Sequence, residues 1–295
     1  GEATYLPDNA VLHQPGDSRN HYSQAYVDWV GRNFSLCEVR TGWFNQKSPL
    51  LFRVWDLWSS WGRDNGLRSI IPATLQLSLT GYPFTFPDMI GGNGYFTYPR
   101  NKLLLGLVNK VIVPAIERRK RAENGDENVN VHASDAPGFT QQNPMFGWPT
   151  AELMIRWTQV NALMPVMQFS ITPWQMGEEC AAICKQYTEL HLEFALLFEQ
   201  LANKAVKTGE SIIQPVFFLS PDDPLALACD DQFLIGDRLM AAPVLEKGKR
   251  SRDIFLPPGT WRDHWTGEHY PGSQVLKKYP APIDVLPIFH RMGKD

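Results

Sequence analysis

Three ionisable side chains, Arg40, Asp56 and Asp88, each close a short apolar run of the sequence. The runs are SLCEVR (35–40), LLFRVWD (50–56) and YPFTFPD (82–88). An apolar run followed by an abrupt change of composition is typical of a strand that ends there. In parallel α/β folds, the residues that do chemistry gather at the carboxyl ends of strands. We therefore expect the three side chains to converge on one pocket, where two carboxyl groups and a guanidinium are suited to proton transfer and to holding hydroxyl groups.

Asp56 stands in an aromatic stretch of the sequence, FRVWDLWSSWGRDNGL (52–67). Its neighbours Trp55, Trp58 and Trp61 would exclude water and favour the neutral acid, which is the form that a proton donor needs. Arg53, three residues earlier, supports a different interpretation, in which Asp56 stays ionised in a structural salt bridge. Both interpretations remain open at this point.

Arg40 and Asp88 also have interpretations without chemistry. Arg40 could be an ordinary surface residue in an ion pair. Asp88 could cap a turn ahead of the flexible stretch GGNG (91–94), since aspartate often accepts backbone hydrogen bonds in turns.

The order of the elements predicts the fold that positions these side chains. Strand-like runs, including MPVMQFS at 164–170, alternate with helical patterns at 68–80 and 150–163, which predicts a parallel α/β sheet. A further long helix is expected at 185–207. Short β-runs separated by Pro-Gly and Asp-rich turns follow residue 211, which is typical of an antiparallel β-sandwich.

We expect two domains, 1–240 and 241–295. The segment at about 97–148 interrupts the α/β alternation with a charged stretch and a long Pro- and Gly-bearing stretch. We interpret it as an insertion within the first domain.

Composition excludes several classes of function. The net charge of −3 and the pI near 6.2 give no basic face for nucleic acid. No apolar stretch approaches the ~18 residues needed to span a membrane, so this segment is expected to be soluble. The four cysteines lack the spacing of a zinc site and indicate buried free thiols or one disulfide. The sequon at Asn33 would be glycosylated only in a secretory compartment.

The sequence resembles glycoside hydrolase family 31, the retaining α-glycosidases, over nearly its whole length. The resemblance is carried by GEATYLP (1–7), RVWDLWSSWGRDNGL (53–67), PDMIGG (87–92) and DQFLIGDRLMAAPVLEKGKRSRDIFLPPGTWRDHWTGE (231–268). It implies the C-terminal half of a (β/α)8 TIM barrel followed by an antiparallel β-sandwich. It also implies a glycoside substrate and no metal or organic cofactor.

The resemblance assigns roles to individual residues. It makes Asp56 the general acid/base, Arg40 and Asp88 ligands of sugar hydroxyls, and Trp55 part of the wall against an apolar sugar face. Ser170 stands where the family usually supplies a sugar-binding histidine. The nucleophile is expected to be an aspartate two residues before Gly1. GEATYLP at the start of this sequence resembles the tail of the motif that contains this aspartate.

The resemblance also suggests a substrate and partners. Short segments such as SLCEVR and MQFS are similar to an α-galactosidase branch of the secretory pathway, so we expect an α-galactoside as substrate. The alternatives are an α-glucosidase or another family 31 α-glycosidase, and a non-catalytic carbohydrate-binding or chaperone-like subunit. The expected partners are the N-terminal remainder of the same polypeptide and, as for many barrel glycosidases, a second copy in a homo-oligomer. Nucleic acid is not an expected partner.

Overall fold

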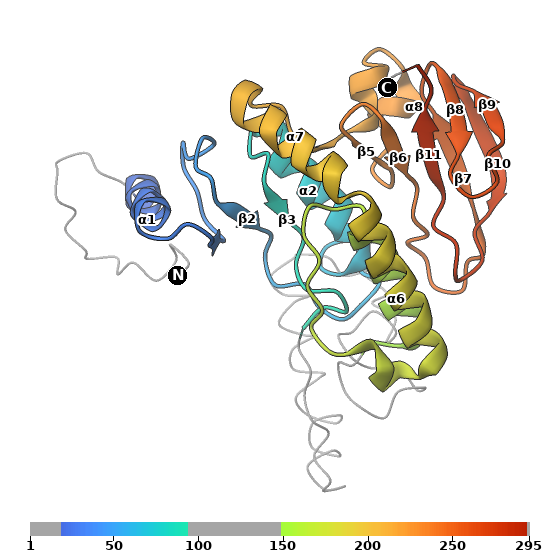
Figure 1. The fold of residues 1–295 in the computed structure, drawn as a ribbon, viewed down its shortest axis with the longest axis horizontal. Coiled ribbons are helices and arrows are strands. Elements are labelled where there is room, and N and C mark those ends of the chain that lie inside the picture. The colour runs from blue at the N-terminus through green and yellow to red at the C-terminus, as the bar shows by residue number, and fades with distance from the viewer. Residues whose placement is uncertain (1–18, 94–148, 294–295) are drawn as a thin grey trace, which may run out of the picture.

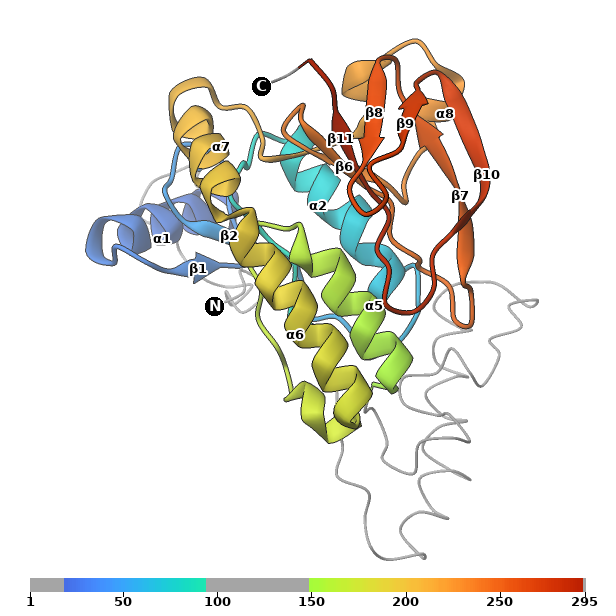
Figure 2. The same cartoon turned by 45° about the vertical axis from the view of Figure 1, so that its right-hand side comes forward.

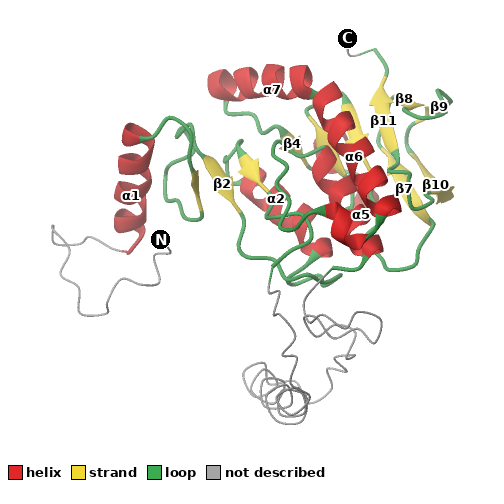
Figure 3. Ribbon diagram, turned by 60° about the horizontal axis from the view of Figure 1, so that its bottom comes forward, coloured by secondary structure: helices red, strands yellow, loops and turns green. Residues whose placement is uncertain are grey.

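The computed structural model describes residues 19–93 and 149–293 (Figure 1). The insertion expected at about 97–148 and the GEATYLP segment lie outside these residues. The chain forms an α/β part and an antiparallel β part that share a core. Helix α1 (Arg19–Asn33) lies at one end of the fold and the strands of the antiparallel part lie at the other (Figure 3).

A small parallel sheet carries the three runs that end in ionisable residues. Its strands are β1 (Glu38–Val39), β2 (Leu51–Arg53) and β3 (Thr85–Phe86), in the order β1-β2-β3. Both strand pairs are parallel, as the sequence predicted. The strand expected at 164–170 is reduced to a single parallel bridge between Ile90 and Phe169.

Helices pack against this sheet and against one another. They are α2 (Ile70–Leu79), which continues the 3₁₀ turn Leu67–Ser69, and α5 (Ala151–Ala162), α6 (Glu178–Glu193) and α7 (Ala195–Thr208). The Thr150 hydroxyl accepts a hydrogen bond from the Leu153 amide at 3.2 Å, which fixes the start of α5. A further 3₁₀ turn, Pro173–Met176, precedes α6.

The helix expected at 185–207 is two helices, because the chain breaks at Phe194. This residue ends α6 with a non-helical backbone (φ −90°, ψ 4°). Its ring packs against the imidazoles of His264 and His290, with centroids 6.0 and 6.3 Å away. A contact with residues far along the chain therefore accompanies the break, and such a contact leaves no trace in the local sequence pattern.

The antiparallel part confirms the predicted β-sandwich (Figure 2). One sheet has the order β4-β5-β6-β11-β8-β9, and the other pairs β10 with β7. The six-stranded sheet consists of β4 (Ile213–Gln214), β5 (Phe233–Ile235), β6 (Leu239–Ala241), β11 (Ile288–Arg291), β8 (Thr260–Asp263) and β9 (His269–Pro271). The pair consists of β7 (Ser251–Leu256) and β10 (Gln274–Pro280). Two short helical turns, Val216–Leu219 and α8 (Pro224–Leu227), connect β4 to β5.

One continuous core joins the helices to the antiparallel part. Trp157 of α5 and Tyr187 of α6 are fully buried in the same cluster as Leu239 and Ile288 of the six-stranded sheet. A second cluster around Trp261 and Phe289 fills the sandwich itself. In residues 19–93 and 149–293, no helix has the length and apolar character needed to cross a bilayer.

Candidate active site

The structure brings the three predicted side chains together at the ends of the parallel strands. The Nη1 atom of Arg40 forms an ion pair with Oδ1 of Asp56. The Nη2 atom of Arg40 lies 3.5 Å from Oδ1 of Asp88. A guanidinium at the end of β1 thus lies between the carboxylates that follow β2 and β3.

Asp88 is completely buried and its charge is compensated on both oxygens. The Nε and Nη2 atoms of Arg53 each lie 2.8 Å from Oδ1. The backbone amide of Leu57 donates to Oδ2 at 2.8 Å. A buried carboxylate is tolerated only with such partners. Asp88 therefore holds in place the backbone that directly follows Asp56.

Arg53 links Asp88 to a carboxylate that the sequence analysis did not assign to the site, Glu38. Its Nη1 atom lies 2.7 and 3.0 Å from the two carboxylate oxygens of Glu38. The guanidinium also lies over the Phe86 ring, 4.5 Å from the centroid. Burial by itself would lower the pKa of Arg53, but the hydrogen bonds to Asp88 and Glu38 outweigh it and raise the pKa. Arg53 is thus firmly held as a cation.

The setting of Asp56 differs from the expected one. Its side chain is 61% exposed, and Trp55 and Trp58 are also exposed. These exposed indoles do not shield the carboxylate from water. The alternative salt bridge between Asp56 and Arg53 is not formed, since Arg53 pairs with Glu38 and Asp88. Asp56 pairs instead with Arg40.

The segment that bears Asp56 is fixed by a side chain that sequence reasoning missed. The side-chain oxygen of Asn65 accepts a hydrogen bond from the Trp58 backbone amide, and its side-chain amide donates to the Asp56 backbone carbonyl at 3.1 Å. The Asp-Asn-Gly sequence at 64–66 is a turn signal that could have indicated such a role.

The next loop approaches this segment closely at Gly92. A Cβ atom on Gly92 would lie 2.6 Å from the Ser59 amide nitrogen, and the residue has φ +73°. The Asn93 amide donates to the Leu57 carbonyl at 2.8 Å. The loops after β2 and β3 therefore pack backbone against backbone.

Two further predicted residues, Ser170 and Asn33, form hydrogen bonds to backbone carbonyls outside the ion-pair cluster. The Ser170 hydroxyl donates to the Ile90 carbonyl at 2.7 Å, so it lies beside the chain that leaves Asp88. The amide of Asn33 donates to the Trp29 carbonyl at 2.7 Å in the exposed last turn of α1. Sugar binding by Ser170 and glycosylation of Asn33 stay predictions.

The cysteines are four free thiols, which decides between the two alternatives that the sequence left open. Cys180 and Cys184 are buried one turn apart on α6, and the Cys184 sulfur lies 3.2 Å from the Thr158 hydroxyl. Within the described part of the chain, no group of three or more potential metal ligands comes together.

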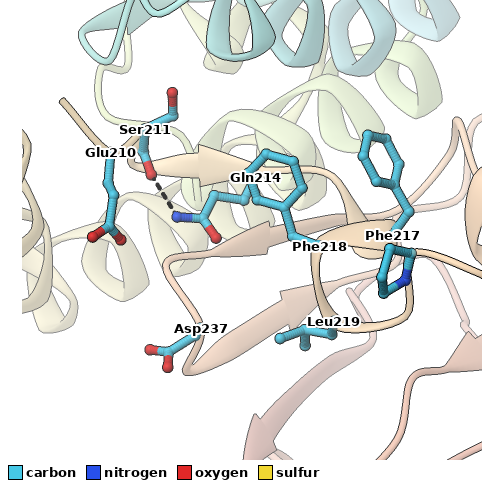
Figure 4. A pocket seen from close by; sticks show the side chains of 8 residues that line it. Glu210, Ser211, Gln214, Phe217, Phe218, Leu219 and Asp237 are labelled. Carbon is cyan, nitrogen blue, oxygen red and sulfur yellow. Dashed lines mark hydrogen bonds between the residues drawn. The ribbon is translucent and has the colours of Figure 1, made fainter.

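A separate cavity of about 620 Å³ lies beside the six-stranded sheet (Figure 4). Phe217, Phe218 and Leu219 line it with apolar side chains, and Gln214 lines it with its side-chain amide donating to the Ser211 carbonyl at 2.9 Å. None of its lining residues belongs to the ion-pair cluster.

Known proteins resemble this chain in both sequence and fold. Residues 209–294 match the family model of the Glycosyl hydrolase family 31 C-terminal domain. Myogenesis-regulating glycosidase from Mus musculus is 38% identical over 291 residues, which is 98% of this chain and 35% of that protein. SITS-binding protein from Tetronarce californica is 29% identical over 247 residues, which is 82% of this chain and 28% of that protein. The chain thus spans about a third of the length of these relatives.

Solved structures share the fold at lower identity. A GH31 family sulfoquinovosidase from E. rectale matches with a TM-score of 0.73 and 19% identity, covering 100% of this chain and 39% of its own. A GH31 α-xylosidase from a soil metagenome matches with a TM-score of 0.67 and 24% identity, covering 93% of this chain and 37% of its own.

Proposed function

Because the chain belongs to glycoside hydrolase family 31, we propose that it forms part of a retaining, exo-acting α-glycosidase that hydrolyses terminal α-galactosides. The observation that supports this most is the meeting of Arg40, Asp56 and Asp88 at the ends of three parallel strands. The proposed fold of the α/β part is the second half of a (β/α)8 barrel, with domains at 1–240 and 241–295.

In the proposed mechanism Asp56 acts twice as a proton carrier. It first donates a proton to the leaving glycosidic oxygen while a second carboxylate attacks the anomeric carbon. It then takes a proton from the water that hydrolyses the glycosyl ester. The exposure of the Asp56 carboxylate suits both steps, because leaving group and water must reach it. The attacking carboxylate is proposed to be the aspartate expected two residues before Gly1.

Arg40 is proposed to bind sugar hydroxyls with the donors that remain beside its ion pair with Asp56. Asp88 is proposed to be a second ligand of sugar hydroxyls at the floor of this pocket. Trp55 is proposed to contact an apolar face of the sugar, and Ser170 to bind the sugar where the family usually has a histidine. The proposed partners are a glycoside, the N-terminal remainder of the polypeptide and a second copy of the chain. Glycosylation at Asn33 would place the protein in the secretory pathway.

The choice of sugar is the finest part of the proposal. Relatives of this chain include Alpha-glucosidase 2 of Bacillus thermoamyloliquefaciens, 33% identical over 149 residues, and the sulfoquinovosidase of Escherichia coli strain K12, 24% identical over 311 residues. A panel of nitrophenyl α-glycosides, assayed with the full natural polypeptide, separates these activities. Faster release of nitrophenol from the α-glucoside than from the α-galactoside would show that the substrate is an α-glucoside.

Replacement of Asp56 by Asn tests the mechanism. We expect kcat/KM to fall by about 10²–10⁴-fold for natural disaccharides, whose leaving groups need a proton, and much less for the glycosylation step of activated aryl glycosides. Asp222→Asn, a matched change at an exposed position, should leave both rates unchanged. Unaltered disaccharide hydrolysis by the Asp56 variant would remove Asp56 from the mechanism.

The ion pair between Asp56 and Arg40 also favours a second candidate, a carbohydrate-binding subunit without turnover, since a binding protein has no need of a free acid. Titration calorimetry with galactose distinguishes the two. Binding together with no hydrolysis of any glycoside in the panel would support the second candidate.

A further inference from the structure

The candidate site contains more acidic than basic side chains. Two guanidinium groups, those of Arg40 and Arg53, serve three carboxylates, those of Glu38, Asp56 and Asp88. Arg40 lies within 4 Å of two of these acids, so the two compete for it. The outcome of this competition decides where the guanidinium lies.

The buried acid should win the competition if nothing else neutralised it. Asp88 is fully buried, whereas the Asp56 side chain is 61% exposed. Attraction between opposite charges is stronger away from water, and an unpaired buried carboxylate is costly. Arg40 nevertheless stays with Asp56, and its Nη2 atom remains 3.5 Å from Asp88. That separation is longer than a normal N–H···O hydrogen bond.

Arg53 accounts for this arrangement. It places two nitrogens 2.8 Å from Oδ1 of Asp88 and so satisfies the oxygen that Arg40 would otherwise approach. Glu38 binds the remaining end of the guanidinium through both carboxylate oxygens, a geometry that fixes direction as well as charge. Glu38 lies on β1 and Arg53 on the adjacent β2, so the sheet itself sets the distance between them.

We infer that Arg53, oriented by Glu38, is a positioning residue that neutralises Asp88 and thereby directs Arg40 to Asp56. Arg53 acts through Arg40 and does not itself touch the substrate. The inference rests on the proposed function where it concerns catalysis. The placement of Arg40 can be observed without any activity.

The first test is the crystal structure of the Arg53→Met variant of the full natural polypeptide. Methionine keeps an unbranched apolar stem in the buried position and removes the guanidinium with its charge. We expect the Arg40 guanidinium to move into hydrogen-bonding distance of Asp88 and to leave Asp56. In the double variant Arg53→Met/Asp88→Asn, which also removes the buried negative charge, Arg40 should return to Asp56. An Arg40 that still pairs with Asp56 in the single variant would overturn the inference.

The second test measures hydrolysis of two α-glycosides of one sugar, one with an alkyl and one with a nitrophenyl leaving group. Displacement of a reacting group by about 1 Å costs up to about 10²-fold in rate. Asp56 loses the partner that fixes its carboxylate when Arg40 moves away. We therefore expect Arg53→Met to lower kcat for the alkyl glycoside by up to about this factor, with a smaller loss for the nitrophenyl glycoside. KM should rise for both glycosides, because Arg40 is also the proposed ligand of sugar hydroxyls. Arg53→Lys should recover part of the loss, because it restores the charge.

Controls separate positioning from folding and from failure of the proposed function. Arg238→Met removes an exposed arginine whose Nη1 donates to Gln200. This variant should hydrolyse both glycosides at the wild-type rate. Glu38→Gln should shift the two rates in the same direction as Arg53→Met and tests the inference if that variant does not fold. Equal losses on both glycosides would indicate a structural role only and would overturn the inference. A wild-type protein that hydrolyses no α-glycoside overturns the proposed function, while the crystal structures still decide the placement of Arg40.

Discussion

At the scale of single residues, Arg156 connects the α/β part to the antiparallel part. It is fully buried on α5. It donates to the carbonyls of Val285, Lys249 and Ala281 at 3.2, 3.2 and 2.8 Å and to Gln159 at 2.9 Å. Burial lowers its pKa to about 10, which leaves it charged at neutral pH. One side chain thus satisfies three carbonyls from two distant segments.

We expect Arg156→Met to destabilise the protein by ~3 kcal/mol or more, because the buried carbonyl of Ala281 and the partly buried carbonyls of Lys249 and Val285 lose a charged donor together. Urea unfolding measured in the full natural polypeptide checks this. The control is Arg250→Met, since Arg250 pairs with Glu152 near the surface and such pairs contribute ~1 kcal/mol or less. Similar losses in the two variants would contradict the role given to Arg156.

At the scale of elements, the contact between the loops after β2 and β3 depends on Gly92. We expect Gly92→Ala to separate these loops and to lower activity toward α-glycosides by at least ~10-fold, because the added Cβ meets backbone atoms that cannot move aside. The control, Gly248→Ala, has a similar φ of +78° but nothing within 4 Å of the new Cβ. It should cost only the ~1–2 kcal/mol of the left-handed backbone. Equal activity of the two variants would show that the close approach is unimportant.

The same scale shows what the sequence could predict. The positions of Asp56 and Asp88 after the ends of strands could be predicted, because a strand end is marked by a local change in amino-acid composition. The exposure of Asp56 and the pairing of Arg53 with Glu38 were not predicted, since both depend on which strands become neighbours. Helix α1 was missed because only Ser23, Val27 and Val30 of its residues are buried, which leaves a weak periodic pattern.

At the scale of the whole molecule, a pair of histidines lies where the sandwich meets the break between α6 and α7. His264 and His290 are stacked, with Nδ1 of the first 3.0 Å from Nε2 of the second, against Phe194. Burial lowers the pKa of both, that of His290 to about 4, with further lowering by its partner and by Arg262. Asp263 acts in the opposite direction on both, and Glu193 does so on His264.

This pair predicts a loss of stability in mild acid. An unfolded histidine takes up a proton near pH 6.5, whereas His290 in the folded protein does so only near pH 4. The unfolded state therefore binds more protons between these values, and the stability present above pH 6.5 is lost as the pH falls toward 4. The urea midpoint should be lower at pH 5.0 than at pH 7.5, and His290→Gln should reduce this difference. An unchanged difference in that variant would assign the effect to other groups.

The anchoring of Arg156 by residues near the far end of the chain has a consequence for protein synthesis. A ribosome makes the residues of the candidate site first, and the carbonyls of Ala281 and Val285 that receive the Arg156 guanidinium are made more than a hundred residues later. A nonsense or frameshift mutation between codons 157 and 280 would leave every residue of the ion-pair cluster and Arg156 encoded, yet it would remove the carbonyls of Ala281 and Val285 that hold the guanidinium. Such alleles should therefore behave as losses of the whole protein.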